Sequence, residues 1–144
     1  MSKIKLTSEE MGLISLLESI TNAPCQDCII DHKLNRLIFV VRPGAISAAI
    51  GKNGMNVKLL RKLTGKNIEI VEYSEDPTRL IVNSLAPAKV KEIRMMEKAN
   101  GEKMVVAVVE PKDKGIAIGK NGRNIEKTRQ LAKRYFGIEH VIIS

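Results

Sequence analysis

The sequence predicts an α+β protein of two tandem units, each with the element order α-β-β-α-α-β and a three-stranded mixed sheet packed against helices. Three observations lead to this prediction. The chain contains an internal repeat, each unit begins with a helix-start signal, and each unit ends with a short apolar run typical of a strand. A chain of 144 residues is long enough for two such units.

The internal repeat aligns residues 40–63 with residues 108–131 without a gap. Both copies contain the tetrapeptide Gly-Lys-Asn-Gly, which forms the first loop (Gly51, Lys52, Asn53 and Gly54) and the second loop (Gly119, Lys120, Asn121 and Gly122). The other identical pairs are Val40/Val108, Val41/Val109, Pro43/Pro111, Ala49/Ala117, Ile50/Ile118, Asn56/Asn124, Arg61/Arg129 and Leu63/Leu131. The repeat therefore predicts one domain over residues 1–75 and a second over residues 76–144.

The first unit is expected to begin with a helix, because Thr7 and Glu10 have the spacing of a capping box. The sequence Asn-Ala-Pro at residues 22–24 ends this helix. Apolar runs at residues 27–30 and 37–41 then predict a β-hairpin.

The rest of the first unit surrounds the first loop. Helices are expected over residues 45–50 and 55–63, on either side of the loop. Gly65 ends the second of these helices, and the apolar run at residues 68–73 predicts the last strand of the unit.

The second unit repeats this order. Asp76 is a good N-cap and Pro77 suits the first helical position, so a helix begins there and continues to Ala86. Asn100-Gly101 is a strong signal for a chain reversal within a hairpin. The remaining expected elements are strands over residues 89–96, 103–109 and 139–143, a short helix after Pro111 and a long helix ending near Tyr135.

The charge of the chain is basic, with a net charge of +8 and a pI near 9.6. Residues 1–75 hold 10 basic and 8 acidic side chains, whereas residues 76–144 hold 14 and 8. A basic surface attracts polyanions, so nucleic acid is the first candidate partner, and the more basic second unit is expected to bind it more strongly. The only aromatic residues are Phe39, Tyr73, Tyr135 and Phe136, so base contacts must come from aliphatic surface and hydrogen bonds.

Several other functions are not favoured. Apolar runs are too short for a membrane span, and the first residues lack a signal-peptide core, so a soluble cytoplasmic protein is expected. Cys25 and Cys28 have only two histidines to complete a metal site, so we expect two reduced thiols and no metal or cofactor. The spacing from Gly115 to Gly119 is too short for a nucleotide-binding Walker loop, and no nucleophile–base arrangement is apparent, so no enzymatic activity or small-molecule substrate is expected.

A Gly-x-x-Gly loop between two helices is suited to binding phosphate. Glycine has no Cβ, so the backbone can turn sharply and approach a partner closely. The helix that follows presents unpaired N–H groups and the positive end of its dipole. Lys52 and Lys120 add a positive charge, and Asn53 and Asn121 tolerate left-handed backbone or donate a hydrogen bond.

The helices that follow the loops are predicted to have an apolar and a basic face. The core positions are expected to be Val57, Leu60 and Leu63 in the first unit and Ile125, Leu131, Ala132 and Tyr135 in the second. The opposite basic stripes are Lys58, Arg61 and Lys62 in the first unit and Arg123, Lys127 and Arg134 in the second. Arg123 directly follows the second loop, so we expect it to contact phosphate.

This arrangement resembles a known family. Ile-Gly-Lys-Asn-Gly between the middle helices resembles the KH domain in its type II topology, and two such units in tandem are similar to the short archaeal NusA-like transcription factors. The segments that carry the resemblance are Asp-Cys-Ile-Ile-Asp at 27–31, Phe-Val-Val at 39–41, Ala-Ile-Gly-Lys-Asn-Gly at 49–54 and Val-Glu-Tyr-Ser at 71–74.

The resemblance implies that RNA lies in a groove of each unit, between the helix–loop–helix and the last strand. The loops would clamp the RNA backbone, and aliphatic side chains would contact the bases. The expected RNA-binding residues are those of the two loops with Ile46, Ile50, Lys58, Arg61, Ile118, Arg123 and Lys127.

The function that follows is a single-stranded RNA-binding transcription elongation or termination factor. Its expected partners are single-stranded RNA and the RNA polymerase elongation complex, without a membrane. A ribosome-associated RNA-binding protein and a non-specific duplex DNA-binding protein remain alternatives.

Overall fold

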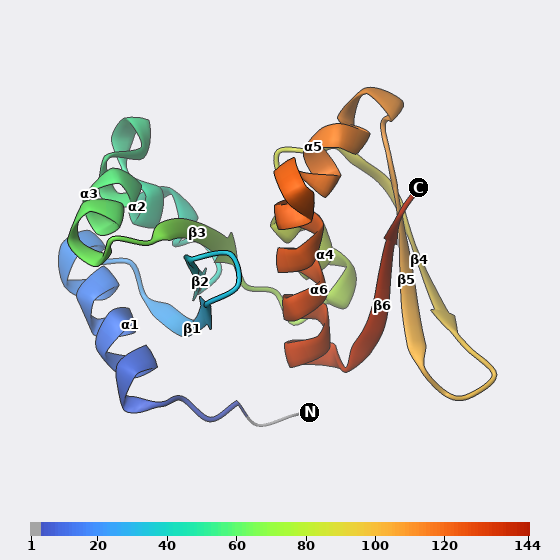
Figure 1. Ribbon diagram of the computed structural model, residues 1–144, viewed down its shortest axis with the longest axis horizontal. Coiled ribbons are helices and arrows are strands. Elements are labelled where there is room, and N and C mark those ends of the chain that lie inside the picture. The colour runs from blue at the N-terminus through green and yellow to red at the C-terminus, as the bar shows by residue number, and fades with distance from the viewer. Residues whose placement is uncertain (1–3) are drawn as a thin grey trace. The chain divides into compact units, whose positions relative to one another are not determined.

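The computed structural model describes residues 4–144, which form two compact units, one of Lys5–Ser74 and one containing Glu75–Ser144. In each unit the helices cover one face of a three-stranded sheet (Figure 1). No helix of these described residues is long and apolar enough to cross a membrane.

The first unit has the predicted element order. Its elements are α1 (Ser8–Thr21), β1 (Cys25–Asp31), β2 (Arg36–Val41), α2 (Ile46–Ile50), a single 3₁₀ turn (Lys52–Gly54), α3 (Met55–Thr64) and β3 (Asn67–Glu72). Strand β2 lies between the other two, antiparallel to β1 and parallel to β3. The sheet is therefore mixed, as predicted, and the α2–loop–α3 segment is the crossover that its parallel pair requires.

Local signals explain where the elements of the first unit begin and end. The hydroxyl of Thr7 accepts a hydrogen bond from the backbone N–H of Glu10 at 3.1 Å, and the Glu10 carboxylate accepts one from the Thr7 N–H at 2.7 Å. This is the predicted capping box, and α1 ends at Asn22, whose φ is 57°. Strand β1 begins two residues earlier than expected, because Cys25 pairs with Val41 across a bulge.

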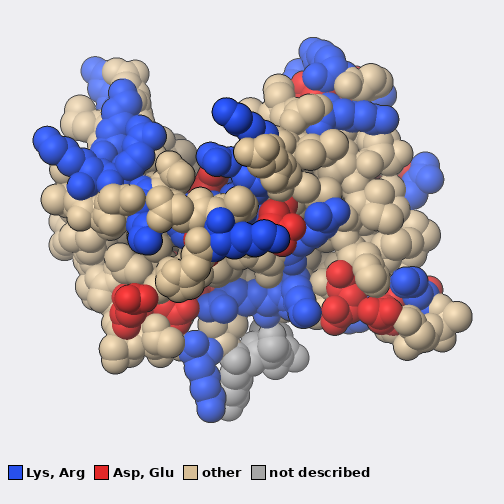
Figure 2. All heavy atoms as spheres, viewed as in Figure 1, with Lys and Arg blue, Asp and Glu red and all other residues tan. Residues whose placement is uncertain are grey.

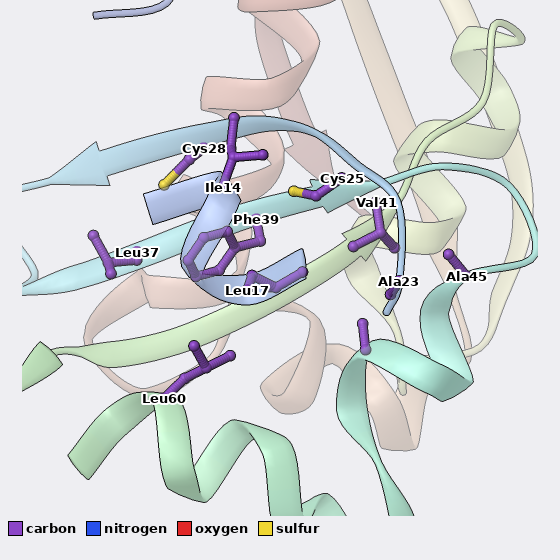
Figure 3. Close-up of a cluster of buried hydrophobic side chains, with 11 residues drawn as sticks. Ile14, Leu17, Ala23, Cys25, Cys28, Leu37, Phe39, Val41, Ala45 and Leu60 are labelled. Atoms are coloured by element: carbon purple, nitrogen blue, oxygen red, sulfur yellow. The ribbon is translucent and has the colours of Figure 1, made fainter. Parts of the chain in front are cut away.

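The core of the first unit lies between its helices and the inner face of its sheet. Figure 3 shows the buried side chains of this cluster, which include Ile14 and Leu17 of α1, Phe39 of β2 and Leu60 of α3. Cys25 and Cys28 belong to the same cluster, and both are free buried thiols. No group of three or more candidate metal ligands occurs among residues 4–144.

The second unit repeats the architecture. Its elements are α4 (Pro77–Leu85), β4 (Val90–Glu97), β5 (Lys103–Val109), a 3₁₀ turn (Pro111–Asp113), α5 (Lys114–Ile118), a second 3₁₀ turn (Lys120–Gly122), α6 (Arg123–Phe136) and β6 (Ile138–Ile143). Strand β5 is antiparallel to β4 and parallel to β6. The Asp76 carboxylate caps α4 by accepting from the N–H of Thr78 at 3.0 Å, and Gly101 takes a φ of 88° in the predicted hairpin turn.

Candidate nucleic-acid interface

The two loops have nearly the same backbone conformation. Gly51 has φ 78° and ψ 167°, and its counterpart Gly119 has φ 79° and ψ 165°. Asn53 and Asn121 are left-handed, with φ of 57° and 58°. Each loop ends on a left-handed glycine that directly precedes the next helix, α3 in the first unit and α6 in the second. Two separate stretches of chain thus build one and the same turn.

The first glycine of each loop is required by its backbone and by its surroundings. The region around φ +78° and ψ 167° is almost exclusive to glycine. A Cβ on Gly51 would lie 2.7 Å from the side-chain nitrogen of Asn56, and one on Gly119 would lie 2.8 Å from the backbone nitrogen of Asn124. The helix after the loop therefore packs directly against the glycine backbone.

Asn56 and Asn124 each hold together the two helices on either side of a loop. The Asn56 amide donates to the carbonyl of Ala48 in α2 at 3.0 Å, and the Asn124 amide donates to the carbonyl of Ile116 in α5 at 3.2 Å. Asn124 also donates to the Leu85 carbonyl at 3.3 Å. Sequence reasoning missed this role, although the identity of Asn56 and Asn124 within the repeat was the signal for it.

The surface of the first unit around its loop is strongly positive. Lys52, Lys58 and Arg61 are all exposed, as predicted. Residues 32–68 contain eight Lys and Arg side chains and no Asp or Glu, and of the eight only Arg36 is buried, where it pairs with Asp31. Figure 2 shows positive side chains gathered over the α2–α3 part of this unit. An anion that approaches the first loop therefore meets no negative side chain from its own helix–loop–helix.

In the second unit, the exposure of the predicted basic side chains differs from the prediction. Lys120 is exposed and Arg123 is partly buried, but Lys127 is only 5% exposed. Lys127 stands one turn before Leu131, which is 1% exposed, so both lie on a covered face of α6. The prediction that Lys127 belongs to an exposed basic stripe is wrong, because a charge pattern does not reveal which face of a helix is covered.

Arg129, the counterpart of Arg61, is held within its own unit. Its Nε donates to the Val141 carbonyl of β6 at 3.4 Å, and its Nη1 lies 3.5 Å from the Glu126 carboxylate. The positive charge that remains beside the second loop is therefore smaller than the net charge of the unit suggests.

The aliphatic side chains predicted to contact bases lie beside the loops. Ile50 is 36% exposed and Ile118 is 42% exposed, at the ends of α2 and α5. Ile46 is half-buried and packs against the core. Ile116, which sequence reasoning missed, is 47% exposed. The helices α2 and α3 both contact β3, the strand predicted to form the other wall of the groove.

This fold, with a Gly-x-x-Gly loop between two helices in each half, defines a protein of two tandem KH-type domains. The family model of the NusA-like second KH domain matches the chain twice, over residues 14–76 and 77–143. The chain therefore belongs to the NusA-like KH family.

Curated relatives and a solved structure agree with this assignment. The chain is 34% identical to "Probable transcription termination protein NusA" of Methanocaldococcus jannaschii, over 98% of this chain and 75% of that protein. It is 36% identical to the protein of the same name from Halobacterium salinarum, over 96% of both chains. A structure titled "Crystal structure of APE1850" is 45% identical, with a TM-score of 0.86 over 96% of this chain and all of that chain.

Proposed function

We propose that this protein is a cytoplasmic transcription elongation or termination factor that binds single-stranded nascent RNA through both loops. The observation that carries the proposal is the duplicated loop, with the same backbone conformation in both copies. The names of the archaeal relatives support the role in transcription termination, and the RNA polymerase elongation complex is the expected setting.

The proposed clamp acts on the sugar-phosphate backbone. The phosphate would lie at the glycine turn, where no side chain prevents close approach, and near the N-terminus of α3 or α6. Lys52 or Lys120 would add a charge-assisted contact from the exposed tip of the loop. The protein binds its RNA in this way without catalysing a reaction.

The bases would lie against aliphatic surface next to each loop. Ile50 and Ile118 present exposed apolar side chains one residue before the glycine turn, and Ile116 extends this surface in the second unit. Backbone groups of β3 and β6 would form hydrogen bonds to the base edges. Because no aromatic platform is used, we expect modest sequence preference that depends on these hydrogen bonds.

The loops are tested by charge reversal that keeps both glycines. Lys52→Asp with Asn53→Asp changes the first loop, and Lys120→Asp with Asn121→Asp changes the second. Aspartate also tolerates left-handed backbone, so the fold should survive. We expect the affinity for single-stranded RNA of about 20 nucleotides, measured by fluorescence anisotropy, to fall by about tenfold or more for each loop.

A matched control separates the loop from charge alone. Lys33→Asp with Asn35→Asp makes the same replacements in the β1–β2 turn, where Asn35 is also left-handed with φ 49°. This control should change RNA affinity far less than the loop variants. Equal losses in the control and the first-loop variant would mean that overall charge, and not the loop, holds the RNA.

A competition experiment and a sedimentation experiment address the alternative functions. Single-stranded RNA and duplex DNA of equal length should compete at fixed salt, and a preference for the duplex would contradict the proposal. In cell extracts the protein should sediment with RNA polymerase, and sedimentation with ribosomes would favour a ribosomal role.

A further inference from the structure

Helix α3 carries a row of exposed apolar side chains that RNA binding by the loops does not use. Met55, Leu59 and Leu63 are 64%, 41% and 57% exposed. Their spacing of four residues places them in one row along the helix, the apolar row. Leu63 was predicted to lie in the core, and that prediction is wrong, because the core of this unit takes Leu60 from the helix instead.

The apolar row ends at an open pocket within the first unit. Leu63 lines the pocket together with Leu13 and Leu16 of α1, Ile30 of β1 and Leu37 of β2. Polar residues at its rim are Glu9, His32, Thr64 and Lys66. The pocket has a volume of about 360 Å³, which is enough for one or two bulky apolar side chains.

The equivalent face of α6 is covered. The repeat aligns Leu59 with Lys127 and Leu63 with Leu131, and these two counterparts are 5% and 1% exposed. The equivalent face is thus buried on α6 and open on α3. Three large apolar side chains in an open row beside a pocket are a feature of interaction sites more than of inert surface.

The charges around the apolar row indicate the chemistry of a partner. Lys58 and Lys62 directly precede Leu59 and Leu63, so they form a parallel row about 100° around the helix. Lys66 stands at the rim of the pocket. Glu9 lies at the α1 side of the rim, so the carboxylates of a partner would favour the lysine side.

An aliphatic row favours an apolar side chain over a nucleobase. In the proposed RNA groove, backbone groups of β3 supply hydrogen bonds to the base edges. The side chains of Met55, Leu59 and Leu63 offer no donor, so a base laid on this row alone would lose its water without gaining a partner. A leucine or phenylalanine of a partner has no such cost.

We propose that the apolar row and its pocket dock an acidic, amphipathic protein segment, which places apolar side chains on Leu59, Leu63 and the pocket and carboxylates on Lys58 and Lys62. Such a segment would bind as a helix that lays its apolar face along α3. This inference does not rest on RNA binding by the loops, and of its residues only Lys58 is also expected to contact RNA.

The probe is a synthetic peptide of about 15 residues, with leucines on one helical face and glutamates elsewhere. One control peptide has the same composition with the leucines dispersed, and another has lysine in place of every glutamate. We expect the full-length protein to bind the first peptide at least about tenfold more tightly than either control in fluorescence anisotropy. Equal affinity for the dispersed peptide would overturn the proposal.

Two pairs of variants locate the site. Leu59→Gln with Leu63→Gln should weaken binding of the acidic peptide by about tenfold or more. Met95→Gln with Met96→Gln is the matched control, because these side chains on β4 are 47% and 43% exposed, and it should leave binding unchanged. Losses of the same size in both pairs would contradict a site on α3.

Charge reversal gives a second test that leaves the apolar side chains in place. Lys58→Glu with Lys62→Glu should weaken the acidic peptide and strengthen the lysine peptide. RNA affinity is measured on the same variants. If Leu59→Gln with Leu63→Gln reduces RNA affinity as much as the first-loop variant does, the row belongs to the RNA surface and the docking proposal is wrong. Failure of the loop variants to affect RNA would concern only the proposed function.

Discussion

At the scale of single residues, the four glycines of the loops differ in how strictly their positions require glycine. Gly51 and Gly119 adopt a conformation that other residues hardly ever take, and each faces the first turn of the next helix. Gly54 and Gly122 are left-handed but have open space where a Cβ would stand. Their replacement therefore costs only the strain of left-handed backbone, about 1–2 kcal/mol.

This difference predicts an order of stability among alanine variants. Gly119→Ala should be the most destabilising, by roughly 2 kcal/mol or more, because its Cβ meets backbone that cannot rotate away. Gly51→Ala should follow, since its nearest neighbour is the movable side chain of Asn56. Gly54→Ala and Gly122→Ala should cost least. Urea denaturation followed by circular dichroism measures the order, and a larger loss for Gly54→Ala than for Gly119→Ala would contradict it.

Cys25 makes the stability of the fold depend on pH in the alkaline range. Burial raises the pKa of its thiol from an ordinary value of 9.0 to about 11, while the thiol lies 3.3 Å from the Asp27 carbonyl and 3.4 Å from the Val40 carbonyl. The unfolded chain releases this proton more readily than the folded one. The contribution of the protonated Cys25 thiol to the free energy of unfolding is therefore complete below pH 9. It is lost as the pH rises toward 11, by roughly 1.4 kcal/mol for each pH unit.

The prediction for Cys25 is tested with Cys25→Ala. Between pH 8 and pH 10.5 the urea midpoint of the natural protein should fall more than that of the variant, because groups other than Cys25 titrate in both. The natural thiol should also react slowly with thiol reagents at pH 8. Identical pH profiles for the two proteins would show that ionisation of Cys25 is not linked to folding.

At the scale of elements, local signals in the sequence predicted the order of helices and strands. The capping box at Thr7, the Asp76 cap and Gly65 each act within one turn of chain, so they are visible in sequence. Positions that depend on tertiary packing were missed. Leu63 and Lys127 have the spacing of core and surface, but the structure reverses them because the covered faces of α3 and α6 differ.

The hydrogen bond between the two helices of the first helix–loop–helix also leads to a prediction at this scale. Asn56→Ala removes the hydrogen bond from α3 to the carbonyl of Ala48 in α2. Because this bond is exposed, the free energy of unfolding should fall by only about 0.5–1.5 kcal/mol. The affinity for single-stranded RNA should fall more than stability implies, since the loop loses its fixed shape. RNA affinity and urea stability are measured on Asn56→Ala and on Asn67→Ala as a control, and unchanged affinity for Asn56→Ala would rule out this role.

At the scale of the whole molecule, the two units carry equivalent loops but unequal surroundings. The net charge of each half favoured stronger binding by the second unit. The structure points the other way, because Lys127 is buried and Arg129 is held by Glu126 and Val141, whereas the first unit has no acidic residue over 32–68. We therefore expect charge reversal of the first loop to reduce RNA affinity more than reversal of the second.

RNA length reveals whether both loops act together. One loop holds about four nucleotides, so a short strand occupies a single unit and can still bind the other unit after reversal of one loop. Its affinity should therefore fall by less than that of a long strand. A strand of about 20 nucleotides can bind both loops, and reversal of one should then cost about tenfold or more. Equal losses for short and long RNA, measured at the same salt concentration, would mean that only one loop binds.

The parallel pairing of β2 with β3 has a consequence for how such a protein arises. The chain must cross over the sheet between these strands, and the helix–loop–helix proposed to bind phosphate is that crossover. The loop is not an addition that could be lost while the sheet remains. Duplication of the stretch of chain that folds as one unit therefore duplicates the proposed binding surface as well, while the side chains around the second copy remain free to diverge.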